Sequence, residues 1–228
     1  MLLSLSPDEL EVISLSVKIA LSCLLINLIP AIMMGYFLAR SQFWGKSLVE
    51  TLVYLPLVLP PVVPGYVLLV LFGNQGVIGK HLSSLGLEFA FNWKGAVLAS
   101  AVMGFPLMVQ SSRLAFEMVD TRLEWVAKSL GASRIGTFFK VTLPLSASGI
   151  VVGAILGFCR SLGEFGATIT FVGNVAGETR TLPLAMYSLL QQADGDVAIM
   201  RLMAFSVGVA FVALFFSQWY HRQQKQKV

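Results

Sequence analysis

Two oppositely charged side chains, Arg160 and Glu164, stand four residues apart in the run RSLGEFGATIT, next to a long apolar stretch. Side chains at this spacing meet on one face of a helix, so the two can form a simple salt bridge. Ionisable groups at the end of a membrane span also mark functional sites, such as proton relays and substrate paths. The pair is therefore predicted either to be a structural salt bridge or to have a functional role, with Gly163, Thr168 and Thr170 beside it.

A second unusual run, TLVYLPLVLPPVVPGYVLLVLF (51–72), places four prolines inside an apolar stretch. Each interior proline removes a helix hydrogen bond and clashes with the preceding turn, so the run cannot form one regular helix. Broken backbone at membrane depth is tolerated only where protein or a water-filled cavity satisfies it. Pro60, Pro61 and Pro64 are therefore expected either to bend a helix buried in a bundle or to line a transport path, because transport sites favour discontinuous helices.

Sets of residues for catalysis or nucleotide binding are not recognisable in the sequence. The Gly-Lys-Ser run at 45–47 is the closing half of a phosphate-binding loop, but the glycine required five positions earlier is Arg40, and no strand precedes the run. His81 and His221 have no second ligand at metal spacing. We therefore expect no enzymatic activity, no metal and no cofactor in this chain.

The composition is that of a membrane protein. Of 228 residues, 56% are hydrophobic and 12% are charged, whereas soluble domains carry about 25% charged residues. Five stretches free of Asp, Glu, Lys and Arg are long enough to cross a bilayer, which takes about 20 helical residues. These stretches are 19–38, 51–72, 95–112, 141–159 and 202–220. We predict an all-α bundle of five membrane-spanning helices, with the interrupted segment 160–196 as the candidate for a sixth.

Basic residues concentrate in alternate connections between the expected spans. Ten of the 16 Lys and Arg residues fall in 39–50, in 113–140 and in the tail 220–228. Because cytoplasmic loops of membrane proteins are enriched in Lys and Arg, the N-terminus is expected outside and the C-terminus in the cytoplasm. Nucleic-acid binding is the weaker explanation of the net charge of +4.

Small residues and prolines predict features of the last two spans. Gly149, Gly153 and Gly157 recur at every fourth position of the fourth span, which gives a face where another helix can pack closely. Pro144 fits the first turn of that helix, where its missing N–H costs nothing. Beyond the span, residues 179–192 (TRTLPLAMYSLLQQ) are expected to form a short helix that starts near their proline.

The stretch TRLEWVAKSLGASRIGTFFKVTLP (121–144) lies between the third and fourth expected spans and has helical periodicity. Its first apolar residues fall on one face: Leu123, Val126, Ala127 and Leu130. Glu124 and Lys128 are expected to pair on another face, and Gly131 is expected to end or bend the helix. The result is a short amphipathic helix on the cytoplasmic side, which either rests on lipid or docks into a groove on a partner.

This stretch resembles the cytoplasmic coupling loop of type 1 ABC importer permeases. Their pattern is Glu-Ala-Ala, three residues, Gly, nine residues, Ile, any residue, Leu-Pro. Gly131 and the Leu-Pro at 143–144 match the pattern, whereas Trp125 occupies the glutamate position and the acidic residue is displaced to Glu124. The resemblance implies that the following residues couple the chain to an ATPase subunit: Glu124, Trp125, Ala127, Lys128, Gly131, Arg134, Leu143 and Pro144.

Two further stretches, YLPLVLPPVVPGYVLL and RSLGEFGATITFVGNVAGETRTLPLAMYSL, look like molybdate permeases. Sulfate permeases share the LGE(F/Y)G and GN elements, but GATITFVGN followed by GETRT is closer to the molybdate branch. The resemblance implies an ABC transporter transmembrane domain over 12–219, with a coupling loop at 120–144 and a basic cytoplasmic tail at 220–228. With an oxyanion as the implied cargo, Arg160 near the outer end of the fourth span is predicted to receive or guide the anion.

The resemblance also implies partners. They are a second copy of this chain, two cytoplasmic subunits that bind ATP and Mg, and an external or periplasmic protein that delivers molybdate or tungstate. The implied location is a bacterial inner membrane, where the chain also contacts lipid. The rival interpretations are a sulfate or thiosulfate ABC permease, a self-sufficient anion channel or secondary transporter, and a membrane anchor for a cytoplasmic enzyme.

Overall fold

The computed structural model of the chain describes residues 5–192 and 195–225, with side chains through Trp219. Within these ranges it contains eleven α-helices and one π-helical segment, and no β-strand, which confirms the predicted all-α fold. The four long helices are α1 (Pro7–Arg40), α5 (Trp93–Glu117), α8 (Leu143–Leu162) and α11 (Asp196–Lys225). The shorter elements are α2 (Lys46–Val58), α3 (Val62–Phe72), α4 (Gly79–Ser83), α6 (Thr121–Ser129), α7 (Arg134–Thr137), the π-helical segment η1 (Phe138–Thr142), α9 (Gly166–Val172) and α10 (Leu182–Leu189).

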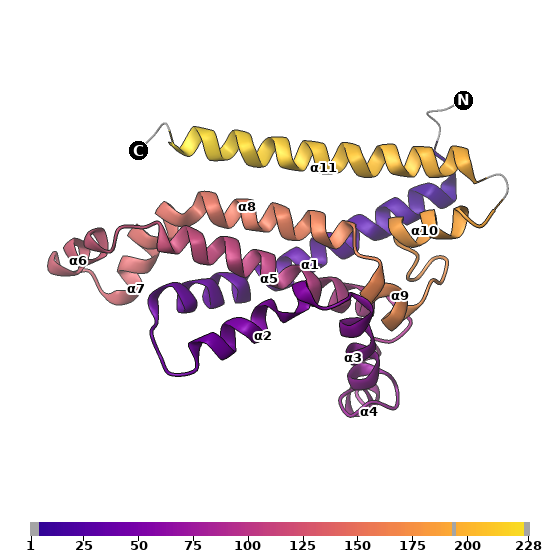
Figure 1. The fold of residues 1–228 in the computed structure, drawn as a ribbon, viewed down its shortest axis with the longest axis horizontal. Helices are drawn as coiled ribbons and strands as arrows, with labels where there is room; N and C mark the ends of the chain where they lie inside the picture. The colour runs from indigo at the N-terminus through magenta and orange to yellow at the C-terminus, as the bar shows by residue number, and fades with distance from the viewer. Residues whose placement is uncertain (1–4, 193–194, 226–228) are drawn as a thin grey trace.

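The long helices run roughly side by side and give an elongated bundle (Figure 1). The helices at Pro7–Arg40, Trp93–Glu117, Arg134–Leu162 and Asp196–Trp219 are each long and apolar enough to cross a membrane. Helices α2 and α3 form a further apolar unit that is bent by 109° at its break. The five predicted spans correspond to these units when the bent pair is counted as one. Residues 160–192 add only α9 and α10, and each is too short to cross a bilayer.

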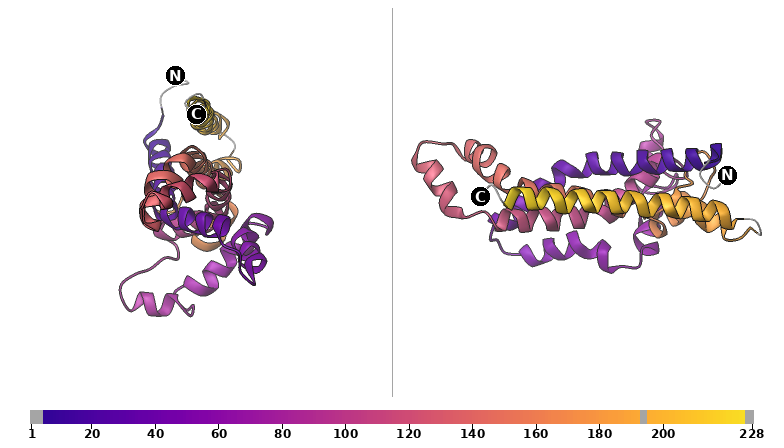
Figure 2. Two further views of the ribbon diagram at one scale, coloured as in Figure 1. Left: turned by 90° about the vertical axis from the view of Figure 1, so that its left-hand side faces the viewer. Right: turned by 90° about the horizontal axis from the view of Figure 1, so that it is seen from above.

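The centre of the bundle is formed by α1, α5 and α8, and the short helix α9 packs against α3 and α5 (Figures 1 and 2). Two caps start the long helices at defined residues. The side chain of Ser6 accepts a hydrogen bond from the N–H of Glu9, whose carboxylate accepts from the N–H of Ser6. At the start of α5, the side-chain oxygen of Asn92 accepts from the N–H groups of Lys94 and Gly95. Deep in the bundle, the amide of Asn27 donates to the carbonyl of Ala101 at 2.8 Å, which joins α1 to α5.

The glycine face of α8 packs directly on α5, as its spacing predicts. A Cβ at Gly153 would lie 2.7 Å from the Cβ of Ser111, and one at Gly149 would lie 2.5 Å from the Cβ of Ala115. These distances are shorter than normal carbon contacts, so only glycine permits this approach of the two helices.

Pro144 lies in the first turn of α8, as predicted, but the fourth span starts earlier than the expected residue 141. Helical structure runs without interruption from Arg134, because α7, η1 and α8 are continuous. In the π-helical turn the N–H of Leu143 donates to the carbonyl of Phe138, five residues back. This wider turn accommodates the proline ring, which would clash with the carbonyl four residues earlier in a regular helix.

Helix α11 covers one side of the bundle, where it contacts α8 and α10 (Figure 2). Most of its apolar side chains are exposed, among them Val207, Phe211 and Phe215. The predicted basic tail 220–228 is helical as far as Lys225. The side chains of 220–225 and residues 226–228 lie outside the part that the structure describes.

Candidate coupling and translocation sites

Helix α6 lies at one end of the molecule, away from the centre of the bundle (Figure 1). The side chain of Asp120 caps its start by accepting a hydrogen bond from the N–H of Arg122 at 2.9 Å. Gly131 follows its end in the left-handed region, with a φ of +88°. The prediction that this glycine ends the helix is therefore confirmed, and the reason is that other residues rarely adopt this conformation.

The outer surface of α6 is apolar and basic. Trp125 is 72% exposed and Leu130 is 83% exposed, and Lys128 is exposed beside them. Such exposed apolar side chains on a helix that protrudes from a protein are typical of a docking face. Among the other predicted coupling residues, Gly131, Arg134 and Pro144 are exposed, and Ala127 and Leu143 are half-buried.

Glu124 does not pair with Lys128, and the prediction of that pair is wrong. The Glu124 side chain turns inward and the residue is only 6% exposed. Its Oε1 accepts hydrogen bonds from the Nη2 of Arg40 at 2.8 Å and from the Nε of Arg40 at 3.2 Å. The hydroxyl of Thr142 donates to the same oxygen at 3.1 Å. A buried carboxylate needs such partners because its charge is costly to remove from water.

These contacts join three elements that are far apart in the sequence. Arg40 is the last residue of α1, Glu124 lies on α6, and Thr142 ends η1. The guanidinium of Arg40 also donates to the carbonyl of Val119 at 3.0 Å, just before α6. Helix α6 is therefore attached to the C-terminal end of α1 and to the start of the fourth span, so a displacement of α6 would act on both helices.

The break between α2 and α3 meets a second break, between α8 and α9. A Cβ at Gly166, the first residue of α9, would lie 2.6 Å from the Cβ of Pro61, and one at Gly65 would lie 2.7 Å from the carbonyl oxygen of Ala167. Pro60 and Pro61 are exposed. The proline run thus forms a bent helix, as predicted, and its bend rests on another discontinuous helix.

Arg160 and Glu164 form the predicted salt bridge, at 2.5 Å between Nη1 and Oε2. Glu164 is 1% exposed, and its Oε1 accepts a hydrogen bond from the N–H of Ala167 at 2.8 Å, in the first turn of α9. The pair therefore connects the end of α8 to the start of α9 across the exposed Gly163. Since Arg160 is partly exposed, its guanidinium can also reach an external anion, and this guiding role stays a prediction.

The hydroxyl groups of the two predicted path threonines donate to backbone carbonyls in and just before α9. Thr168 is fully buried, and its hydroxyl donates to the carbonyl oxygens of Glu164 and Phe165. The hydroxyl of Thr170 donates to the carbonyl of Gly166 at 2.8 Å. Pro64 is also buried. In this conformation neither threonine offers its hydroxyl proton to a passing anion, and their role in a path stays a prediction.

A polar network at the end of the molecule opposite α6 was missed by the sequence reasoning. Arg201 of α11 donates to both carboxylate oxygens of Glu9 on α1, at 2.7 to 3.2 Å. Nearby, the Nε of Arg180 donates to the side-chain oxygen of Asn174, whose amide donates to the hydroxyl of Ser188. The only available signal was a charge beside an apolar run, because these partners are distant in the sequence.

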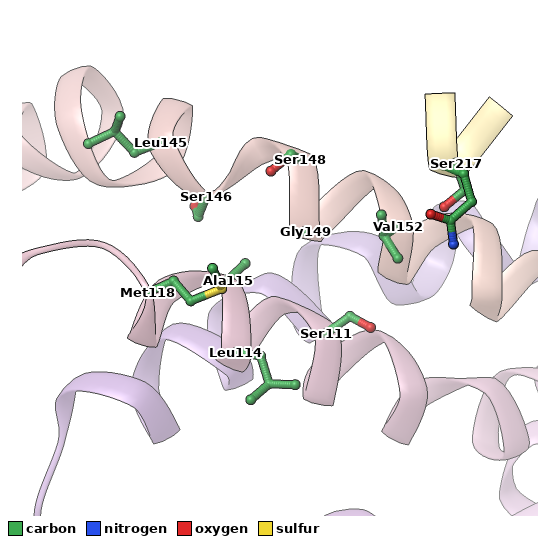
Figure 3. A pocket seen from close by; sticks show the side chains of 11 residues that line it. Ser111, Leu114, Ala115, Met118, Leu145, Ser146, Ser148, Gly149, Val152 and Ser217 are labelled. Carbon is green, nitrogen blue, oxygen red and sulfur yellow. The ribbon is translucent and has the colours of Figure 1, made fainter. Parts of the chain in front are cut away.

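A cavity of about 420 Å³ lies among α5, α8 and the last turns of α11 (Figure 3). Ser111, Ser146, Ser148 and Ser217 give it hydroxyl groups, but its lining contains no cationic side chain and no predicted path residue. The cavity is therefore not suited to hold an anion. Among residues 5–192 and 195–219, no three His, Cys, Asp or Glu side chains are grouped so that they could hold a metal ion.

Comparison with protein families gives one match that covers most of the chain. Residues 31–226 match the family described as "Binding-protein-dependent transport system inner membrane component". The matched range includes α6, the bent pair α2 and α3, and the break before α9. The chain belongs to this family. It is therefore a membrane-spanning permease of the ABC importer class, and the predicted family is confirmed.

Individual relatives of the permease carry names that specify molybdenum. This chain is 50% identical over 221 residues to the molybdenum transport system permease protein ModB of Haemophilus influenzae, and the match covers 96% of each chain. It is 49% identical over 224 residues to the protein of the same name in Escherichia coli K12, covering 98% of each. A putative molybdenum transport system permease protein of Bacillus subtilis is 38% identical over 90% of each chain.

Two solved structures share the fold of this permease. A bacterial ABC transporter involved in the import of the acidic polysaccharide alginate matches with a TM-score of 0.73 and 21% identity, over 97% of this chain and 80% of that chain. An amino acid ABC transporter matches with a TM-score of 0.62 and 18% identity, over 95% of this chain and 94% of that chain. Identities this low establish the fold alone, and the predicted type 1 ABC importer fold is confirmed.

Proposed function

We propose that this permease is the membrane-spanning subunit of an ATP-driven importer of molybdate. The identity of 50% to a molybdenum transport permease, over 96% of both chains, is the observation that carries this proposal. The proline-broken α2–α3 pair and the break before α9 support it, because transport sites in membranes are built from discontinuous helices.

The proposed importer obtains its energy from separate subunits. Two cytoplasmic subunits bind ATP and Mg, and they dock on α6 of each copy in a homodimer of this permease. The exposed apolar and basic face of α6 supports the docking, and the Arg40–Glu124–Thr142 contacts supply a route by which motion of the ATPase reaches α1 and α8. The permease itself carries out no catalysis.

An external or periplasmic binding protein delivers the anion in this proposal. One solved relative of the fold was crystallised "in complex with alginate pentasaccharide-bound periplasmic protein", which supports a partner of that kind. It would dock at the end of the molecule that holds α10 and the first turn of α1, opposite α6 (Figure 1).

We propose a matching orientation in a bacterial inner membrane. The basic connections and the last turns of α11 face the cytoplasm and the start of α1 faces outward, in line with the excess of Lys and Arg in cytoplasmic loops. Residues 12–219 act as the transmembrane domain, 120–144 as the coupling loop and 220–228 as a cytoplasmic tail.

The path of the anion is assigned to the region where the two broken helices meet. A path that must release a dianion cannot hold it with many cations, since conduction requires binding that is weak enough to leave. Arg160 is the basic side chain at this meeting point, and the neighbouring backbone is interrupted at Leu59–Pro61 and at Gly163–Phe165. The proposal is that Arg160 attracts the anion and that the broken backbone passes it on.

Uptake of labelled molybdate at submicromolar concentration tests the function. Cells that lack their own molybdate permease would express this chain with its ATPase and binding protein, and would face excess sulfate or tungstate. The proposal expects uptake that survives sulfate and falls with tungstate, because tungstate is a near-isosteric dianion.

An uptake that sulfate abolishes would instead assign the chain to sulfate or thiosulfate import. A complex that inserts and binds the ATPase but transports none of these anions would contradict the assignment to this oxyanion class. Transport in the absence of an ATPase subunit would favour a channel or a secondary transporter.

A further inference from the structure

An apolar groove runs along the surface between α1 and α5, at the end of the bundle opposite α6. Its volume is about 460 Å³. It is lined by Ser22, Ile26, Phe89, Trp93, Lys94, Val97, Leu98 and Ala101. Apart from one hydroxyl and one ammonium group, these side chains are apolar, so the groove is suited to a hydrocarbon chain.

One end of the groove is basic. The ammonium of Lys18 lies 3.7 Å from the centroid of the Trp93 ring, and Lys94 follows this tryptophan directly. Both lysines are exposed, and none of the ion pairs formed by the described residues includes either of them. A lysine ammonium has three donors, so Lys18 can contact the ring and still donate to an anion.

The dimensions of the groove match one leaflet of a bilayer. From Lys18 to Ile26 on α1, and from Trp93 to Ala101 on α5, the helices rise by about 12 Å each. The apolar part of one leaflet is about 15 Å thick, half of the hydrocarbon core. Lys18 directly precedes the charge-free stretch 19–38, which places the basic end at the level of the lipid head groups, where tryptophan also concentrates.

We propose that this groove binds an anionic phospholipid, with one acyl chain along Ile26 and Val97 and the phosphate between Lys18 and Lys94. The apolar lining excludes a free oxyanion from most of the groove, and the two cations without acidic partners favour an anionic head group over a zwitterionic one. Which leaflet supplies the lipid rests on the orientation given under the proposed function, whereas binding itself does not depend on transport.

Quenching of Trp93 by brominated lipid tests the proposal on the full chain in bilayers. The other tryptophans are replaced in a Trp44→Phe, Trp125→Phe, Trp219→Phe variant, so that only Trp93 fluoresces. This variant is reconstituted with phosphatidylglycerol or with phosphatidylcholine, each brominated near the carbonyl end of its acyl chains. The proposal expects half-maximal quenching at a mole fraction of phosphatidylglycerol that is roughly tenfold or more below the mole fraction of phosphatidylcholine needed. The reason is that each lysine near an anionic lipid strengthens binding by about fivefold.

Neutralising the lysines provides the decisive variant. Lys18→Gln with Lys94→Gln is expected to bring the two lipids to equal quenching, whereas Lys80→Gln, on α4 and outside the groove, is expected to preserve the preference. Ser22→Phe, which fills the groove but keeps both lysines, is expected to weaken quenching by both lipids.

Equal quenching by the two lipids in the chain with both lysines would overturn the proposal, and so would a preference that survives the double lysine variant. Because the measurement reports lipid contact without any transport, its failure would leave the molybdate proposal intact. A failure of molybdate uptake would likewise leave the lipid result standing.

Discussion

Glu124 is the residue whose role changes most between sequence and structure. Its spacing suggests an exposed pair with Lys128, but it is buried and held by Arg40 and Thr142. A buried carboxylate that keeps its charge must have a cation and hydrogen-bond donors around it, and removing the cation leaves an uncompensated charge. The contact is therefore expected to matter both for stability and for transmission of motion from α6.

Arg40→Gln is expected to destabilise the permease by about 2 kcal/mol, because it leaves the carboxylate of Glu124 without its cation. The change is measured as a lower unfolding temperature in detergent and as fewer anions transported per ATP hydrolysed by the complex. Adding Glu124→Gln to the variant should recover part of the lost stability, since both charges are then absent.

Arg122→Gln is the matched control for that experiment. Arg122 lies on the same helix and is exposed, and it forms none of the ion pairs of the described residues. If Arg40→Gln and Arg122→Gln gave the same unfolding temperature and the same coupling ratio, the Arg40–Glu124 contact would have no structural or coupling role.

Arg160→Gln is expected to reduce kcat/KM for molybdate uptake by about tenfold and to weaken its dependence on ionic strength, because a cation at the path attracts the dianion. Arg160→Lys should retain most of the uptake. The double variant Arg160→Gln, Glu164→Gln separates attraction of the anion from pairing with Glu164, since it removes the carboxylate that Arg160→Gln alone leaves unpaired. Unchanged uptake and unchanged salt dependence in Arg160→Gln would reduce Arg160 to a structural partner of Glu164.

At the scale of helices, the contact between α5 and α8 depends on the absence of side chains. A Cβ at Gly153 would lie 2.7 Å from the Cβ of Ser111, whereas a Cβ at Gly208 of α11 would have no atom within 4 Å. Both positions are in regular helix, so an alanine at either gains the same helix propensity. Only an alanine at position 153 must also push two packed helices apart.

Gly153→Ala is therefore expected to lower the stability of the permease by about 1 kcal/mol, because overpacking outweighs the gain in propensity. Gly208→Ala should be neutral or stabilising by up to about 1 kcal/mol. Thermal unfolding of the two variants in the same detergent makes the comparison. Equal unfolding temperatures would mean that α5 and α8 can move apart at no cost.

The end of α6 also depends on a glycine. Gly131 has a φ of +88° and open space around it, so a side chain there meets backbone strain of about 1–2 kcal/mol but no clash. Gly131→Asp is expected to change the exit of the chain from α6, which would abolish uptake while the complex still inserts. Uptake assays together with ATP hydrolysis by the complex measure this loss of coupling.

Gly86→Asp is the control for backbone strain, because Gly86 has a φ of +74° and open space but lies between α4 and α5, far along the chain from α6. It should lose similar stability and keep coupled transport. Normal uptake by the Gly131→Asp variant would remove the model in which α6 transmits motion.

At the scale of the whole molecule, the proposed function assigns different roles to the two ends of the bundle. One end carries α6 and the last turns of α11, and the other carries α10 and the first turn of α1 (Figure 1). The breaks of α2–α3 and α8–α9 lie toward the second end, on the side opposite α11 (Figures 1 and 2). An importer that accepts its anion from an external binding protein and is driven by a cytoplasmic ATPase needs its two docking sites at opposite ends.

The orientation of the permease is measurable by labelling introduced cysteines. After replacement of Cys23 and Cys159, the variant Ser129→Cys on α6 is expected to react with a membrane-impermeant maleimide only in inside-out vesicles. Ser84→Cys, at the end of α4, should react in intact spheroplasts, because both serines are exposed and α4 lies well apart from α6 along the long axis of the bundle (Figure 1). The reverse pattern would contradict the proposed orientation.

Much of this protein is determined by local sequence. The charge-free stretches, the prolines of 51–72, the glycine spacing of α8 and Gly131 each act on their own helix, through hydrogen bonds and clashes within one or two turns. For that reason the spans, the break near Pro60, the packing face and the end of α6 were all predictable from the residues themselves.

The tertiary structure decided what local periodicity cannot report. Glu124 meets Arg40 across 84 residues and Glu9 meets Arg201 across 192 residues, and the sequence contains no signal that selects these partners. The fourth span continues back to Arg134 through a π-helical turn, and α3 turns by 109° from α2 onto α9. Such features are set by which elements pack together, because a buried charge or a bent backbone is stable only where a distant segment satisfies it.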